Sequence, residues 1–255
     1  MKAGAAVFAS GLLGSCEPSR STGSASRETG TNEETAAGRL TARPRRGAGR
    51  SVAPGLTDLS GPGERPLLLY VPETYDRREP APFMLALHGA GGDAERGIRH
   101  LADHADAAGL LLLAPSSRDR TWDVVFGEFG PDVKMIDEAL GDVFARFAVD
   151  RTHIAIEGFS DGASYALSLG PTNGDLFTHV IAFSPGFRSP EDPLGLPPVF
   201  ISHGRQDPVL PIDEASRSIV PALRDEGYEV TYEEFEGGHQ VPREIAKAAV
   251  DWFLG

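Results

Sequence analysis

The residues of this 255-residue chain best suited to chemistry form the pentapeptide Gly158-Phe159-Ser160-Asp161-Gly162. Residues 153–157 before it predict a short buried strand, and residues 163–169 after it predict a helix. A serine on a sharp strand-to-helix turn is exposed as a nucleophile, and the flanking glycines let the two backbones pass close together. Because G-x-S-x-G arises by chance in about one chain in ten of this length, the assignment depends on partners for Ser160.

A serine hydroxyl needs a base within hydrogen-bond distance to become a nucleophile at neutral pH. Among the seven histidines, His239 fits best, because Gly237-Gly238 places it on a permissive loop between the last predicted strand and the last predicted helix. His88 and His203 each precede a glycine at a strand end, where a structural role is as well founded as a catalytic one. The others are predicted to be solvated on a helix or to begin strands: His100, His104, His153 and His179.

The carboxylate that orients the base is expected on a loop that follows a strand between Ser160 and His239. Asp207 meets this condition in the segment His203-Gly204-Arg205-Gln206-Asp207-Pro208. The alternative acids are Asp192, Asp213 and Glu214, of which the last two fall within a predicted helix and are expected to be solvated. The sequence therefore predicts a catalytic triad of Ser160, Asp207 and His239.

The negative charge that develops during ester cleavage requires backbone N–H donors. The Asp161 N–H follows the nucleophile, and the Ala90 N–H lies in the glycine-rich turn after His88, so these two groups are the expected oxyanion hole. Gly91 and Phe159 are candidates for the substrate pocket. Trp122, in the loop 116–131, is a candidate pocket wall or, equally, a packing residue.

Continuous apolar runs alternate with helical patterns along the remainder of the chain, which specifies a mostly parallel sheet with helices on both faces. Ligands of such sheets bind at the carboxyl ends of the strands, where the turns that carry Ala90, Ser160 and Asp207 all lie. The predicted strands are 66–72, 82–88, 110–114, 153–157, 180–185, 198–203 and 229–235. The predicted helices are 93–108, 131–147, 163–169, 212–226 and 242–254.

The charge distribution excludes one class of partner. Residues 1–55 carry eight Lys or Arg and four Asp or Glu, whereas the remaining residues carry 16 basic and 33 acidic side chains. Phosphate contact requires clustered basic side chains, so the acidic body argues against nucleic-acid binding. It should also disfavour strongly anionic substrates.

The N-terminal segment has the features of an export signal. Lys2 precedes a short apolar stretch that ends at Leu13-Gly14-Ser15-Cys16, similar to a bacterial lipoprotein cleavage box. We expect a signal peptide over 1–16, a disordered linker over 17–55 and a catalytic domain over 56–255. Lipid on Cys16, the chain's one cysteine, would then anchor an exported bacterial protein to a membrane; an unprocessed N-terminus would leave it cytoplasmic.

These motifs resemble the α/β-hydrolases of the phospholipase/carboxylesterase and dienelactone-hydrolase-like group, near polyhydroxybutyrate depolymerases and feruloyl esterases. The matching segments are Tyr70-Val71-Pro72-Glu73-Thr74-Tyr75-Asp76, Leu87-His88-Gly89-Ala90-Gly91-Gly92-Asp93, the Ser160 pentapeptide, His203-Gly204-Arg205-Gln206-Asp207-Pro208 and Gly238-His239. The resemblance covers about residues 62–255. It implies an α/β-hydrolase fold and a serine esterase that uses neither a cofactor nor a metal. Dienelactone hydrolases carry a cysteine nucleophile where this chain has Ser160, so that particular activity is not implied.

The expected function is therefore hydrolysis of short-chain or small soluble carboxylic esters through an acyl-enzyme. No insertion is long enough to form a large lid domain, which predicts an open site. The triad does not separate an esterase from a peptidase or a thioesterase. A catalytically silent binding protein is the third alternative, although such a protein has no need for all three triad residues.

Overall fold

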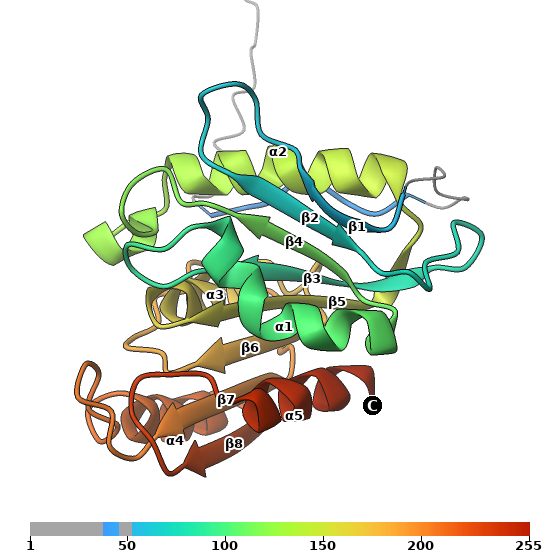
Figure 1. The fold of residues 1–255 in the computed structure, drawn as a ribbon. Coiled ribbons are helices and arrows are strands. Elements are labelled where there is room, and N and C mark those ends of the chain that lie inside the picture. Colours follow the sequence, from blue (N-terminus) through green and yellow to red (C-terminus); the bar gives the residue numbers. More distant parts are fainter. Residues whose placement is uncertain (1–37, 46–52) are drawn as a thin grey trace, which may run out of the picture. The chain divides into compact units, whose positions relative to one another are not determined.

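The computed structural model describes residues 38–45 and 53–255. Its centre is an eight-stranded sheet with the order β1-β2-β4-β3-β5-β6-β7-β8 (Figure 1). The strands are β1 Gly55–Asp58, β2 Leu67–Val71, β3 Ala81–Leu87, β4 Leu111–Pro115, β5 Val149–Phe159, β6 His179–Phe183, β7 Val199–Gly204 and β8 Val230–Phe235.

The sheet is parallel from β4 to β8, whereas β2 runs antiparallel to both β1 and β4. This arrangement confirms the predicted mostly parallel sheet. Strand β1 was not predicted from the sequence, because it has four residues, of which three are exposed, and so it lacks an apolar pattern. The carboxyl ends of β3 to β8 share one edge of the sheet (Figure 1), which is the edge expected to carry the site.

Helices cover both faces of the sheet, as predicted. Buried side chains of α1 and α5 pack on one face, and those of α2, α3 and α4 pack on the other. The central strands β3, β4 and β6 are almost wholly apolar because they are buried on both sides. The helices are α1 Ala94–Ala108, α2 Pro131–Arg146, α3 Asp161–Thr172, α4 Ser216–Asp225 and α5 Arg243–Leu254, with a short 3-10 helix, η1, at Asp123–Phe126.

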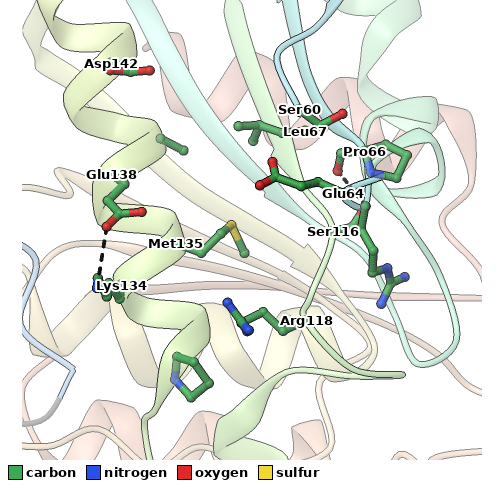
Figure 2. A pocket seen from close by; sticks show the side chains of 13 residues that line it. Ser60, Glu64, Pro66, Leu67, Ser116, Arg118, Lys134, Met135, Glu138 and Asp142 are labelled. Carbon is green, nitrogen blue, oxygen red and sulfur yellow. Dashed lines mark hydrogen bonds and ion pairs between the residues drawn. The ribbon is translucent and has the colours of Figure 1, made fainter. Parts of the chain in front are cut away.

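A cavity of about 600 Å³ lies between α2 and the loop that joins β1 to β2 (Figure 2). Its walls carry side chains of both charges, among them Glu64, Arg118, Lys134 and Glu138. None of the three predicted triad residues lines it. The cavity is therefore distinct from the predicted site of chemistry.

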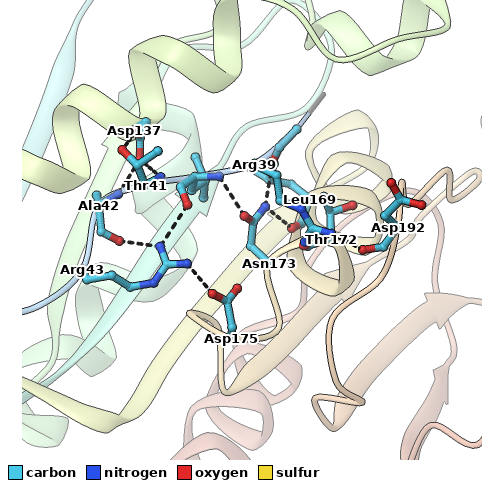
Figure 3. Close-up of polar contacts among 12 residues, drawn as sticks. Arg39, Thr41, Ala42, Arg43, Asp137, Leu169, Thr172, Asn173, Asp175 and Asp192 are labelled. Carbon is cyan, nitrogen blue, oxygen red and sulfur yellow. Dashed lines mark hydrogen bonds and ion pairs between the residues drawn. The ribbon is translucent and has the colours of Figure 1, made fainter. Parts of the chain in front are cut away.

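Residues 38–45 lie against the middle of α2, at Asp137, and against the carboxyl-terminal end of α3, at Asn173 (Figure 3). Leu40 is 3 % exposed, and the Leu40 N–H donates to Asn173 Oδ1 at 2.8 Å. Asn173 Nδ2 in turn donates to the Gly38 carbonyl at 2.8 Å. Arg39 donates to the carbonyls of Thr172 and Asp192. This N-terminal strap corrects the expectation of a disordered linker over all of 17–55, because Leu40 buries apolar surface and its backbone polar groups are paired.

The strap predicts a measurable contribution to stability. Leu40→Ala should lower the free energy of unfolding by about 2–4 kcal/mol, since it removes a buried side chain and leaves a cavity. Urea unfolding would measure the change, with Arg45→Ala as the matched control, because Arg45 is exposed on the same segment and should change stability by less than about 0.5 kcal/mol. Equal stability of the two variants would contradict the packing of the strap.

The predicted signal peptide, with Cys16, and residues 17–37 and 46–52 of the predicted linker lie outside the described residues. Within 38–45 and 53–255, no helix has both the length and the apolar character that a bilayer crossing requires.

Candidate active site

Ser160 sits on a strained turn between β5 and α3. Its backbone has φ 56° and ψ −118°, a region of backbone dihedral angles that residues other than glycine rarely occupy. A Cβ on Gly158 would lie 2.1 Å from the Gly162 carbonyl oxygen, and a Cβ on Gly162 would lie 2.3 Å from the Leu87 carbonyl oxygen. Both positions therefore require glycine, for the close backbone approach that the sequence predicted.

The structure brings the three predicted triad side chains together. Ser160 Oγ lies 2.8 Å from His239 Nε2, and His239 Nδ1 lies 2.6 Å from Asp207 Oδ2. The chain thus contains a continuous hydrogen-bonded path from hydroxyl to imidazole to carboxylate. This geometry allows the imidazole to accept the serine proton while the carboxylate holds the proton on Nδ1.

Asp207 is held as a carboxylate by its surroundings. Its Oδ1 accepts the N–H groups of Val209 at 2.8 Å and Leu210 at 2.9 Å. Burial alone would raise the pKa of Asp207, but the hydrogen bonds from Leu210, His239 and Val209 outweigh it and lower the pKa below its usual range. Asp207 is therefore ionised at neutral pH.

His203 lies beneath this carboxylate and is fully buried. Its Nε2 is 2.9 Å from the Leu210 carbonyl and 3.2 Å from Asp207 Oδ2, while Nδ1 is 2.7 Å from Ser216 Oγ. The Nε2–H group therefore donates toward both oxygens, and Nδ1 accepts from the serine hydroxyl. Burial lowers the pKa of His203, so the ring is neutral. His203 therefore has a structural role, in which it holds the turn that carries Asp207.

The two predicted oxyanion donors belong to backbone segments that meet at Ser160. Asp161 is the first residue of α3, where N–H groups have no intrahelical acceptor. Ala90 is exposed, and among the described residues its N–H donates to no protein acceptor. Gly89 contacts the nucleophile, since a Cβ there would lie 3.2 Å from Ser160 Cβ. The glycine-rich turn and the start of α3 are therefore neighbours.

His88 and Trp122 anchor the glycine-rich turn from inside the protein. His88 Nε2 accepts the Ser117 N–H at 2.9 Å, and its Nδ1 donates to the Gly89 carbonyl at 2.8 Å. Trp122 Nε1 donates to the His88 carbonyl at 2.8 Å, and its ring is fully buried against Tyr165. The pocket-wall interpretation of Trp122 is therefore wrong. An indole with a satisfied N–H and full burial is a packing residue.

The other two candidate pocket residues lie at the surface of the site. Gly91 is exposed and has φ 66°, and its N–H donates to the Arg120 carbonyl at 2.6 Å. Phe159 is half-buried, with its ring 4.7 Å from that of His239. Phe159 therefore packs against the imidazole, whereas Gly91 shapes the loop that carries Ala90.

A row of hydroxyls on α3 fixes the segment that follows β6. Ser164, Ser168 and Thr172 are buried, and each donates to the carbonyl four residues earlier. Each hydroxyl also accepts one or two N–H groups of that segment, from Gly186, Phe187, Ser189 and Glu191. The segment between β6 and β7 is thus attached to the helix of the nucleophile and contains no helix of its own.

Glu157 lies three residues before Ser160, and its side chain is fully buried. His100 Nε2 is 2.8 Å from Glu157 Oε1, and the His100 side chain is 15 % exposed. The expectation that His100 is solvated was therefore wrong, because it faces the sheet from α1 and contacts this acid. Burial raises the pKa of Glu157, and His100 offsets the effect in part.

The raised pKa of Glu157 predicts a pH-dependent stability. A carboxyl with a raised folded-state pKa stabilises the fold below its unfolded pKa, about 4.3, and that contribution is lost as pH rises through the folded pKa. Glu157→Gln stays neutral, so its stability relative to the parent should rise between about pH 4 and pH 8. Urea unfolding at both pH values measures this, with exposed Glu214→Gln as the control. Parallel pH profiles of Glu157→Gln and the parent would contradict it.

Comparison with known proteins agrees with this fold. Residues 132–252 match the phospholipase/carboxylesterase family. The chain is 32% identical over 149 residues to a putative esterase, NocK, of Nocardia uniformis, covering 54% of this chain and 43% of the relative. It is 28% identical over 162 residues to a probable feruloyl esterase C of Aspergillus oryzae, covering 59% and 57%. The chain thus spans about half the length of these curated relatives.

The solved structure of esterase PE8 superimposes with a TM-score of 0.59 and 23% identity, covering 74% of this chain and 97% of that one. Strand order, helix placement and this likeness together show that the chain has the α/β-hydrolase fold. The phospholipase/carboxylesterase pattern lies in the carboxyl-terminal half of this fold.

Proposed function

We propose that this protein is a serine hydrolase of carboxylic esters. The observation that carries the proposal is the hydrogen-bonded path Ser160 Oγ–His239 Nε2 at 2.8 Å and His239 Nδ1–Asp207 Oδ2 at 2.6 Å. The strained backbone of Ser160 supports it, because such strain persists where function requires it. The names of the relatives, putative esterase and probable feruloyl esterase, favour an ester over other acyl substrates.

The proposed reaction proceeds in two steps. His239 Nε2 takes the proton of Ser160 as Oγ attacks the ester carbonyl, and the N–H groups of Ala90 and Asp161 stabilise the oxyanion. The C–O bond to the alcohol then breaks, and His239 gives its proton to the leaving alkoxide. In the second step His239 activates a water that attacks the acyl-enzyme, and the acid product leaves as Ser160 regains its proton.

We further propose that the substrates are short-chain or small soluble esters. The segment between β6 and β7 is held on α3 and contains no helix, so no lid domain forms an enclosed acyl tunnel there. The acidic composition after residue 55 favours neutral over anionic substrates.

A p-nitrophenyl ester series from acetate to palmitate tests this proposal, with methyl ferulate, an aryl thioester and a peptide p-nitroanilide as comparison substrates. We expect kcat/KM to be highest for the short acyl chains and low for the anilide. Preference for the thioester or the anilide would favour the thioesterase or peptidase alternative. The absence of turnover on all substrates would favour the silent binding protein.

A further inference from the structure

The loop that carries Ala90 is also held from the outside of the protein, by an arginine that the sequence pattern did not single out. Arg65 lies in the loop between β1 and β2, far from the triad in sequence. Its Nη2 donates to the Gly92 carbonyl at 2.7 Å. Its Nη1 donates to the carbonyl of Ser117 at 2.6 Å and to that of Asp119. One guanidinium therefore joins the glycine-rich loop to the loop that follows β4.

The Gly92 carbonyl, which accepts from Arg65, belongs to the same turn as Ala90, one of the two proposed oxyanion donors. Gly92 closes a turn with Gly89, through a hydrogen bond of 3.0 Å from the Gly92 N–H to the Gly89 carbonyl. Gly89 lies against Ser160 Cβ, and Ala90 and Gly91 form the exposed part of the turn. Movement of Gly92 would therefore move the Ala90 N–H relative to Ser160 Oγ.

The loop that follows β4 also contacts the segments that form the proposed oxyanion hole. The Gly91 N–H donates to the Arg120 carbonyl at 2.6 Å, and Thr121 Oγ1 donates to Asp161 Oδ2 at 2.6 Å. Arg120 and Thr121 thus contact the two segments that supply the proposed N–H donors. Because Arg65 binds the carbonyls of Ser117 and Asp119, it fixes these segments relative to each other.

We propose that Arg65 is a positioning residue that sets the geometry of the oxyanion hole. The inference rests on the proposed function, since it concerns the donors of that same site. The planar guanidinium offers several N–H groups in a fixed arrangement and can join carbonyls of two loops at once. A lysine ammonium keeps the charge but cannot reproduce this geometry.

Arg118 supplies a matched control. It lines the same cavity as Arg65, between α2 and the β1–β2 loop (Figure 2). Among the described contacts its guanidinium makes no hydrogen bond or ion pair, and the residue is exposed. Arg118→Ala therefore removes an equal charge from the same cavity without removing a contact to either loop.

The experiment compares the parent, Arg65→Lys, Arg65→Ala and Arg118→Ala on an aryl ester and on its thiono analogue, in which sulfur replaces the carbonyl oxygen. Sulfur accepts hydrogen bonds weakly, so the thiono ester gains less from an oxyanion hole, whereas both substrates depend equally on the triad. We expect the Arg65 variants to lose about tenfold in kcat on the ester with KM nearly unchanged. The ratio of ester to thiono ester kcat/KM should fall by a similar factor. Arg118→Ala should change both values by less than about twofold.

Hydrogen exchange of the amides of residues 89–92 provides a second measurement that does not depend on turnover. It should be faster in Arg65→Lys than in the parent and unchanged in Arg118→Ala. An unchanged ester to thiono ester ratio in an active Arg65 variant, or unchanged exchange at residues 89–92, would overturn the positioning role. A parent that hydrolyses neither substrate would instead overturn the proposed function.

Discussion

Ser160→Ala is expected to lower kcat for a short-chain p-nitrophenyl ester by about 10⁴–10⁶-fold. The variant removes the one oxygen that lies 2.8 Å from His239 Nε2, so no nucleophile remains for the acyl transfer. Residual turnover would come from backbone donors and water alone. The rate of p-nitrophenol release under saturating substrate measures the loss.

The fold should survive this change, because the substitution keeps Cβ and the backbone. Ser160→Gly provides a further control, which tests the backbone strain at this position. Its lack of Cβ suits φ 56°, so it should be equally inactive but more stable than Ser160→Ala, by about 1 kcal/mol in urea unfolding. Ester hydrolysis by Ser160→Ala within tenfold of the parent would show that another group performs the chemistry.

Asp207→Asn is expected to lower kcat by about 10⁴-fold with the fold intact. Asp207 Oδ1 accepts the N–H groups of Val209 and Leu210, so the amide oxygen of the variant should occupy that position. The amide NH₂ then faces His239 Nδ1 and donates to it. This places the imidazole proton on Nε2, which can no longer accept the proton of Ser160.

Asp213→Asn is the matched control, since Asp213 lies on the same connection after β7 but its side chain is 78 % exposed and pairs with Arg217. It should retain kcat within about twofold. If Asp213→Asn lost activity and Asp207→Asn did not, the acid would have to be reassigned.

The candidate triad could be predicted from sequence because each of its residues follows a strand that the sequence pattern also predicts. Ser160, Asp207 and His239 lie just after β5, β7 and β8, and parallel strands bring their carboxyl ends to one edge. The spacing of the glycines also predicted the sharp turn at Ser160, where Gly158 and Gly162 leave no room for a side chain. Local patterns and one topological rule were therefore enough for the triad.

The sequence could not predict the contacts that cross between distant segments. The strap at Leu40 lies in a stretch that composition alone marks as a linker, and its pairing with Asn173 spans 133 positions. Arg65 reaches Gly92, Ser117 and Asp119 from a polar loop, and polar loops carry no periodic signal. The buried pair of Glu157 and His100 was missed for the same reason, since a single acid within an apolar strand has no sequence partner.

For Trp122, the sequence could not distinguish a residue that lines a pocket from one that packs in the core. Its position in a long loop before α2 suggested a surface role in the site, yet the ring is fully buried between His88 and Tyr165. A large aromatic in an irregular segment can close the core beneath the segment as well as line a pocket. Only the tertiary arrangement distinguishes the two roles.

Trapping the acyl-enzyme tests most directly whether Ser160 is the nucleophile. The parent is mixed with p-nitrophenyl acetate, quenched in acid within the first turnovers, digested and examined by mass spectrometry, beside Ser160→Ala. We expect one acetyl group on the peptide that contains Ser160, and none on the corresponding peptide of the variant. An acetyl group on a different residue, or rapid ester hydrolysis with Ser160 never acylated, would contradict it.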